Sequence, residues 1–141
     1  MEKVLVDSNI FLDYYLDRKS GLAPIGEYAF QFMKSTIECN YYLILCKESI
    51  WELSAVLGIT EEDVFQKVLS GINVKRKFEL TSPSLLQKRE AKGISQKRNV
   101  PYVDALFAIV ARDLKIRVIT RDKHFFEELG DIVSSNKPEE L

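Results

Sequence analysis

Near its N-terminus the chain carries the segment Val4-Leu5-Val6-Asp7-Ser8-Asn9, in which three apolar residues are followed at once by three polar ones. A short apolar run of this kind is typical of a strand buried inside a sheet. Asp, Ser and Asn are among the residues that most often cap the start of a helix. The segment therefore predicts a buried strand over residues 4–6 that leads directly into a helix.

The rest of the chain repeats this alternation. Strand composition is found at residues 41–45, 78–80 and 117–120. Helical spacing or helix-start signals are found at residues 11–17, 25–38, 46–57, 60–69, 83–89 and 101–114, and after Asp122. Strands separated by helices predict a parallel sheet covered on both faces. We therefore predict one α/β domain over residues 1–141, an α/β/α sandwich with Rossmann-like topology, in which residues 134–141 fray.

Composition limits the classes of protein to consider. The chain is 46% hydrophobic and 29% charged, as in an ordinary globular protein. No apolar run approaches the ~20 residues that span a bilayer, and no signal peptide precedes Val4, so we expect a cytoplasmic protein without a membrane partner. Cys39 and Cys46 form no metal-type pair with His124, the single histidine, and we expect them to be reduced packing residues.

Basic residues are concentrated between Lys75 and Arg98, where eight of them stand against two acidic residues. This segment therefore carries a charge of +6, and the remainder of the chain, whose total is −1, carries −7. One interpretation is a solvated helix face. The other is a surface that binds a phosphate backbone.

Four acidic residues fall where a strand meets a helix, or within the first two turns of a helix. They are Asp7, Glu52, Asp104 and Asp122. In an alternating β/α fold these positions meet at one edge of the sheet. Carboxylates gathered there repel one another unless some take up protons or a divalent cation binds among them. Because carboxylate-bound metal is typical of phosphoryl transfer, the four acids predict a metal-dependent nuclease.

Each acid taken singly also has a structural interpretation. Asp7 and Asp122 could cap helices, Asp104 could interact with a helix dipole, and Glu52 could be a surface charge. We favour the functional interpretation because all four fall at one edge. In addition, Asp7 and Asp104 stand among apolar neighbours, where Ser or Thr would cap a helix equally well.

The four segments resemble those of the PIN-domain ribonucleases, the family that includes VapC-like toxins of toxin–antitoxin pairs. The matching segments are Val4 to Asp13, Glu52-Leu53, Pro101-Tyr102-Val103-Asp104-Ala105 and Thr120-Arg121-Asp122-Lys123-His124-Phe125. They occur in the family's order and span nearly the whole chain. The resemblance implies a PIN-like fold and RNA hydrolysis by Mg²⁺ or Mn²⁺ held by the four acids. It also implies substrate or supporting contacts from Ser8, Asn9, Thr120, Arg121 and His124, and an antitoxin as a possible partner.

One position departs from the family pattern. His124 stands where many members have a second acid, so the number of metal ions stays open. We expect His124 to contact phosphate or to support the ligands, because hard ions prefer carboxylate to imidazole. We also expect Glu52 to matter more than Glu48, one turn earlier. The helix dipole already explains Glu48, whereas Glu52 lies at the rim of an apolar face, where an unpaired carboxylate is costly.

Other acid-bearing folds fit less well. A receiver domain needs two adjacent acids after its first strand, and Asp7 has no acidic neighbour. A haloacid-dehalogenase-type phosphatase needs Asp-x-Asp, and here the second position is Asn9. No glycine-rich phosphate loop is present. A PIN-like module that binds RNA or protein without cutting remains an alternative.

Aromatic residues are dense in the predicted first two helices. They are Tyr14, Tyr15, Tyr28, Phe30 and Phe32. They could complete the core, or they could form a homodimer face or a groove for an amphipathic partner helix.

Overall fold

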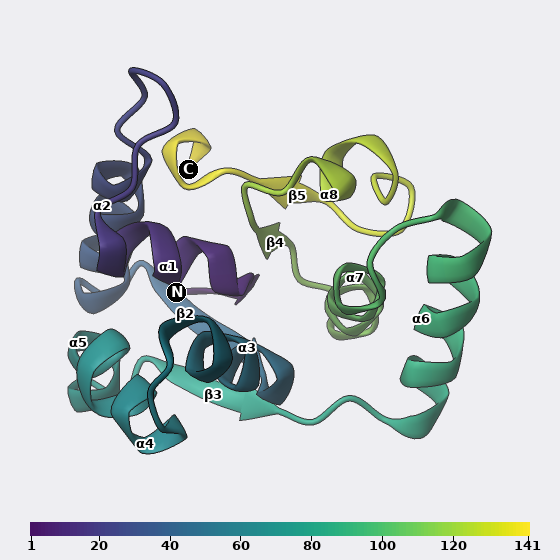
Figure 1. Cartoon of the computed structure of the whole chain (residues 1–141), viewed down its shortest axis with the longest axis horizontal. Coiled ribbons are helices and arrows are strands. Elements are labelled where there is room, and N and C mark those ends of the chain that lie inside the picture. The colour runs from purple at the N-terminus through teal and green to yellow at the C-terminus, as the bar shows by residue number, and fades with distance from the viewer.

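The computed structural model describes residues 1–141 and contains one five-stranded parallel sheet with helices on both faces (Figure 1). The strands are β1 (Glu2–Val6), β2 (Tyr41–Cys46), β3 (Phe78–Thr81), β4 (Val118–Ile119) and β5 (Ser135–Asn136). The helices are α1 (Ser8–Leu16), α2 (Ile25–Ile37), α3 (Lys47–Leu57), α4 (Glu61–Asp63), α5 (Ser70–Val74), α6 (Leu85–Arg98), α7 (Tyr102–Leu114) and α8 (Lys123–Glu127). A π-helical segment (Val64–Val68) joins α4 to α5, and a 3₁₀ turn (Pro138–Glu140) follows β5. This architecture confirms the predicted α/β/α sandwich.

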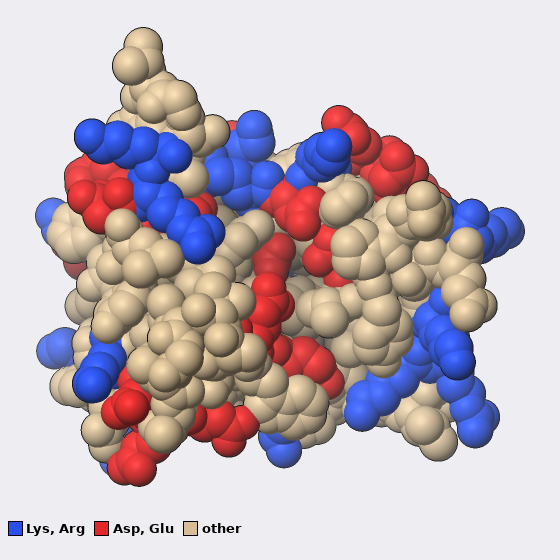
Figure 2. Space-filling model, viewed as in Figure 1, with Lys and Arg blue, Asp and Glu red and all other residues tan.

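The order of strands across the sheet is β3-β2-β1-β4-β5. The chain therefore builds one half of the sheet outward from β1 and then returns to build the other half. This reversal lies between β1 and β4, where ligands bind at the carboxyl ends of the strands in open parallel sheets. Asp7 directly follows β1 and Asp122 closely follows β4. In the space-filling view, acidic side chains line a depression between the two halves of the molecule (Figure 2).

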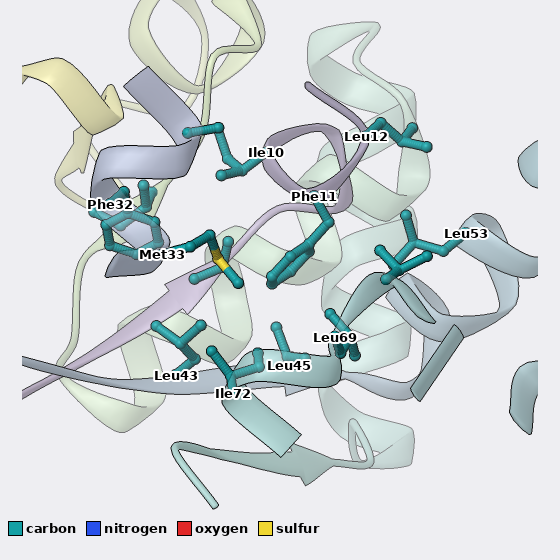
Figure 3. Packing of buried hydrophobic residues seen from close by; sticks show 14 of the residues in the cluster. Ile10, Phe11, Leu12, Phe32, Met33, Leu43, Leu45, Leu53, Leu69 and Ile72 are labelled. Atoms are coloured by element: carbon teal, nitrogen blue, oxygen red, sulfur yellow. The ribbon is translucent and has the colours of Figure 1, made fainter. Parts of the chain in front are cut away.

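Alternate residues of β1 pack on opposite faces of the sheet. Val4 and Val6 join a cluster with α1, α2, α3 and the helical residues 64–72, whereas Leu5 joins a second cluster built mainly from α7. Because both faces are covered, residues 4–6 form an uninterrupted apolar run. In the first cluster Ile10, Phe11 and Leu12 of α1 pack with residues of α2, α3 and β2 (Figure 3). This packing holds the start of α1, and with it Asp7, at the edge of the sheet.

None of the helices combines the length and the apolar character needed to cross a bilayer.

Helix α6 is longer than the sequence predicted. It continues to Arg98, well beyond the expected end near residue 89. Ser84 and Gln87 cap its first turn reciprocally, with hydrogen bonds of 2.8 and 3.1 Å. Ala91 is its one buried residue, so no apolar stripe reveals its length.

Part of residues 134–141, which we predicted to fray, is paired with the rest of the chain in the structure. Ser135 and Asn136 form β5, which pairs with β4. Pro138 is buried, and the Glu139 carboxylate accepts two hydrogen bonds from Arg121, at 2.7 and 2.8 Å. A strand of two residues has too short a pattern to be recognised from sequence.

Candidate functional site

The hydroxyl of Thr120 connects Asp7 with Asp122. The backbone N–H of Asp7 donates to the carbonyl of Ile119 at 3.0 Å. The Thr120 hydroxyl donates to Oδ2 of Asp7 at 2.8 Å and accepts from the backbone N–H of Asp122 at 3.1 Å. The turn after β4 therefore orients the carboxylate that ends β1. Thr120 is fully buried, so the geometry supports this orienting role and not the predicted contact with substrate.

Asp7 does not serve as a helix cap. It stands at the N-cap position of α1, but its side chain makes no hydrogen bond to the first turn. Burial raises the pKa of Asp7 to about 6; the Thr120 hydrogen bond opposes this rise, and the negative charges of Glu52 and Asp122 add to it. The interpretation of Asp7 as a helix cap is therefore wrong.

Asp104, Asp122 and His124 form a compact group. Asp104 lies in the first turn of α7, and Asp122 caps α8 by accepting from the backbone N–H of His124 at 3.0 Å. Nδ1 of His124 lies 3.1 Å from Oδ2 of Asp104 and 2.8 Å from Oδ1 of Asp122. One potential ligand atom from each residue lies within 4.8 Å of the others. Burial raises the pKa of Asp104 well above its ordinary value, and the charges of Asp122 and Asp7 raise it further.

The charge of Glu52 affects the acids of this group, whereas the charge of Glu48 affects residues next to the group. Glu52 is exposed on α3, yet its charge contributes to the raised pKa of both Asp7 and Asp104. Oε2 of Glu48 is buried without a hydrogen-bond partner. Together with burial, the charge of Glu48 raises the pKa of the Cys46 thiol and of the Tyr102 phenol. The structure thus brings the four predicted acids together, with Glu48 on their flank.

Ser8 and Asn9 flank Asp7 at the start of α1. Ser8 is fully buried, and its hydroxyl donates to Oδ1 of Asp7 at 3.4 Å. Asn9 is half-buried, and its Oδ1 atom has no hydrogen-bond partner. Ser8 therefore supports Asp7, whereas the Oδ1 atom of Asn9 is buried and left without a partner.

Arg121 does not join the acidic group. Its guanidinium donates to both carboxylate oxygens of Glu139, and its Nε atom lies 3.5 Å from Oδ2 of Asp13. It also lies over the ring of Tyr28, 5.9 Å from the centroid. Asp13 is a buried carboxylate that the sequence does not reveal, because an acid within a helix carries no signal of burial. The role of Arg121 as a substrate contact stays a prediction that this geometry does not support.

The five aromatic residues of the predicted first two helices are divided between core and surface. Phe32 is buried, and Tyr14 stacks on Phe30 with ring centroids 6.2 Å apart. Tyr15 and Phe30 remain 42% and 43% exposed. A homodimer formed through the exposed rings of Tyr15 and Phe30 stays a prediction. Sedimentation at high protein concentration tests it.

The chemistry of the donors fits a divalent cation. Two buried carboxyl groups, those of Asp7 and Asp104, have raised pKa values, so a positive charge beside them favours the state in which both are ionised. Oxygen donors of this kind suit Mg²⁺ and Mn²⁺. The imidazole of His124 adds a nitrogen donor that first-row transition ions accept more readily than Mg²⁺ does.

Comparison with known proteins agrees with this arrangement. Residues 4–131 match the PIN domain. A toxin–antitoxin complex from Klebsiella pneumoniae has a similar fold, at 16% identity and a TM-score of 0.61, over 96% of this chain and 97% of that chain. FitAcB from Neisseria gonorrhoeae is similar at 18% identity and a TM-score of 0.63, over 98% and 99%.

At these identities the two solved structures show a shared fold alone. Among proteins of curated function, no significant sequence match was found. The family match, by contrast, extends from β1 to the segment after α8 and includes all four acids. The chain therefore belongs to the PIN domain family.

Proposed function

We propose that this chain is a metal-dependent endoribonuclease that hydrolyses phosphodiester bonds of RNA at Asp7, Glu52, Asp104 and Asp122. The observation that carries the proposal is the burial of Asp7 and Asp104 beside further negative charges. Burial and mutual repulsion of the carboxylates destabilise the folded protein, and a bound cation removes this destabilisation. Carboxyl groups with strongly perturbed pKa values are also concentrated at functional sites. Membership of the PIN domain family supports the same class of reaction.

The residues of the group have separate roles in this proposal. Asp7, Asp104, Asp122 and Glu52 hold Mg²⁺ or Mn²⁺. When bound, the ion supplies Lewis acidity to the scissile phosphate and to the attacking water. Thr120 and Ser8 orient Asp7 through their hydrogen bonds. Asn9, half-buried beside Asp7, contacts the substrate.

His124 sets the preference of the site for Mn²⁺ over Mg²⁺. Its Nδ1 atom lies among the carboxylate oxygens of Asp104 and Asp122, and a nitrogen donor suits the transition ion better. This role goes beyond the phosphate contact expected from the sequence. Calorimetric titration of the wild type and of His124→Asp with both ions tests it. We expect the ratio of Mn²⁺ to Mg²⁺ affinity to fall in the variant, and an unchanged ratio would contradict the role.

Cleavage of a mixed RNA pool tests the ribonuclease itself. The purified chain is incubated with Mn²⁺, with Mn²⁺ and excess chelator, and as Asp7→Asn. Asn keeps an acceptor for the Thr120 hydroxyl but removes the charge. We expect fragments with the wild type and Mn²⁺ alone; cleavage that survives the chelator would contradict metal dependence. RNA binding without fragments under any divalent ion supports the alternative, a PIN-like binding module without turnover.

The finer role that we propose is that of the toxin in a toxin–antitoxin pair, with an antitoxin protein as partner. It is supported by the fold shared with the toxin–antitoxin complex from Klebsiella pneumoniae. An apolar cavity of about 270 Å³, lined mainly by Ile50, Trp51, Phe65 and Leu80, offers a surface for such a partner. We expect expression of the wild type, but not of Asp7→Asn, to stop growth, and the protein encoded beside its gene to relieve the arrest. Normal growth with active enzyme would contradict this role.

A further inference from the structure

A cavity of about 470 Å³ lies along α6, outside the acidic group. It is lined by Lys88, Arg89, Lys92, Ser95, Gln96 and Tyr102. Its volume falls within the roughly 300–1,000 Å³ range of ligand sites. No acidic side chain lines it, and Lys and Arg side chains gather over α6 at the right of the space-filling view (Figure 2). The cavity is therefore suited to an anionic ligand.

The spacing of α6 explains the positive charge of this lining. Lys88 and Lys92 are four residues apart and Arg89 and Lys92 are three apart, so the three cations lie on one helical face. Glu90, the one acid of this helix, points elsewhere: Arg112 of α7 donates to its two carboxylate oxygens at 2.6 and 2.8 Å. The three cations form no ion pair within the chain, and their charge is available to a ligand.

Tyr102 connects the cavity with the flank of the acidic group. It lines the cavity as the first residue of α7, and it is 38% exposed. Asp104 stands two residues later, where the helix directs its side chain to another side. Burial and the charge of Glu48, which lies on the flank of the acids, raise the pKa of the Tyr102 phenol, so the ring lies near that flank. A chain molecule that runs from the cavity to the acids can therefore pass the Tyr102 ring.

We propose that this cavity binds the backbone of single-stranded RNA and guides it to the acidic group, with one unpaired base stacked on Tyr102. The inference rests on the proposed ribonuclease function and names the form of its substrate. The acids of the site repel phosphate, so an RNA strand needs a cationic surface on which to approach. A basic groove with an exposed aromatic ring is a common means of binding single strands, because a base of a duplex is already stacked on its neighbours.

Binding measured without cleavage tests the cationic part. Full-length Asp104→Asn protein in chelator is titrated with a fluorescent single-stranded RNA oligonucleotide at several salt concentrations. Adding Lys88→Gln and Lys92→Gln should weaken binding. It should also lower the slope of log affinity against log salt by about 1.4, since each phosphate contact to a single strand contributes about 0.7.

A charge-matched pair, Lys75→Gln and Lys97→Gln, serves as the control. Lys97 follows Lys88 by nine residues on α6, which places it on the opposite face of the helix. We expect this pair to leave the slope unchanged. Equal changes in both pairs would overturn the cavity as the binding site, because net charge alone would then explain them. Thermal melting verifies that each variant is folded.

The aromatic part is tested with Tyr102→Leu and Tyr102→Phe. We expect Leu to weaken binding of the single strand by about 5- to 100-fold and Phe to leave it near the wild type. Binding of a duplex of the same sequence should not respond to either change. An unaffected single strand, or an equal loss for the duplex, would overturn stacking on Tyr102.

The outcomes separate this inference from the proposed function. If the wild type cleaves RNA while the cavity variants bind and cleave as it does, the cavity inference fails and the ribonuclease stands. If the cavity variants lose RNA binding but no divalent ion supports cleavage of RNA by the wild type, the cavity is supported as the RNA-binding site and the proposed ribonuclease activity is contradicted.

Discussion

The hydroxyl of Thr120 donates a 2.8 Å hydrogen bond to Oδ2 of Asp7, across 113 positions of sequence. The bond is buried and joins the ends of β1 and β4, the two strands between which the winding of the sheet reverses. It also opposes the effect of burial on the pKa of Asp7. The hydrogen bond thus orients the carboxylate and favours its ionised form against the effect of burial, at the place where a cation is proposed to bind.

Thr120→Val should move the acid limb of the pH profile of cleavage. Val has nearly the same shape but donates no hydrogen bond, so the pKa of Asp7 should rise further above about 6. The proton then competes with Mn²⁺ to a higher pH. We expect the acid limb of kcat/KM in Mn²⁺ to shift to higher pH, with Thr120→Ser close to the wild type. An acid limb that stays in place would show that Thr120 does not act on Asp7.

The stability of the metal-free protein should fall as pH rises. Asp7 has a pKa of about 6 when folded and near 3.8 when unfolded, so the folded state binds the proton more tightly. The resulting stabilisation is complete below about pH 4 and is lost as pH rises through about 6. We expect Asp7 to contribute about 1 kcal/mol more to the free energy of unfolding at pH 5 than at pH 8, as measured by denaturant unfolding in chelator.

Asp7→Asn provides the comparison for this pH effect, since it removes the titrating group. In chelator at pH 8 the variant should be more stable than the wild type, by up to about 3 kcal/mol. A variant that is less stable at pH 8 would mean that the charge of Asp7 is compensated within the protein.

Glu52→Gln and Glu48→Gln form a matched pair one helical turn apart. The charge of Glu52 acts on Asp7 and Asp104, whereas that of Glu48 acts on Cys46 and Tyr102. We expect Glu52→Gln to lower kcat/KM for RNA by about 100-fold or more and Glu48→Gln by less than about 10-fold. The reverse order would make Glu48 the ligand carried by α3.

Arg121→Met should affect stability far more than cleavage. The substitution removes the nearer of the two cations beside the buried carboxylate of Asp13 and leaves only Arg18, at 3.9 Å, which costs up to about 3 kcal/mol. At a temperature where the variant is folded, we expect kcat/KM within a few-fold of the wild type. A large loss of activity in a fully folded variant would restore Arg121 as a substrate contact.

The sequence was sufficient to predict the convergence of Asp7 and Asp122, because parallel strands end at the same edge of a sheet. It was not sufficient to distinguish Asp7 from a helix cap. That distinction depends on the partner of the side chain, and Thr120 reaches Asp7 only when β1 and β4 pair. Pairing between two segments that are distant in sequence cannot be recognised from the local residue pattern of either segment.

The sequence also could not exclude a substrate contact for Arg121, because the partners of its side chain come from distant segments. Its partner Glu139 lies in a tail that was expected to fray, where the two-residue β5 is held by pairing with β4. The basic segment from Lys75 to Arg98 was left with two interpretations for a different reason. Composition gives its charge, but only the folded structure separates the cations that line a cavity from Arg98, which pairs with Asp131.

Titration of the metal-free protein with Mn²⁺ in a calorimeter, beside Asp104→Asn, tests most directly whether the four acids share a cation. We expect the wild type to bind Mn²⁺ and to gain about 2.7 kcal/mol of stability at a free concentration one hundred times the Kd. Asp104→Asn should fold but bind Mn²⁺ at least about 10-fold more weakly, because a charged donor is lost. A wild type without measurable Mn²⁺ binding, or a variant that binds Mn²⁺ as tightly as the wild type, would contradict the account.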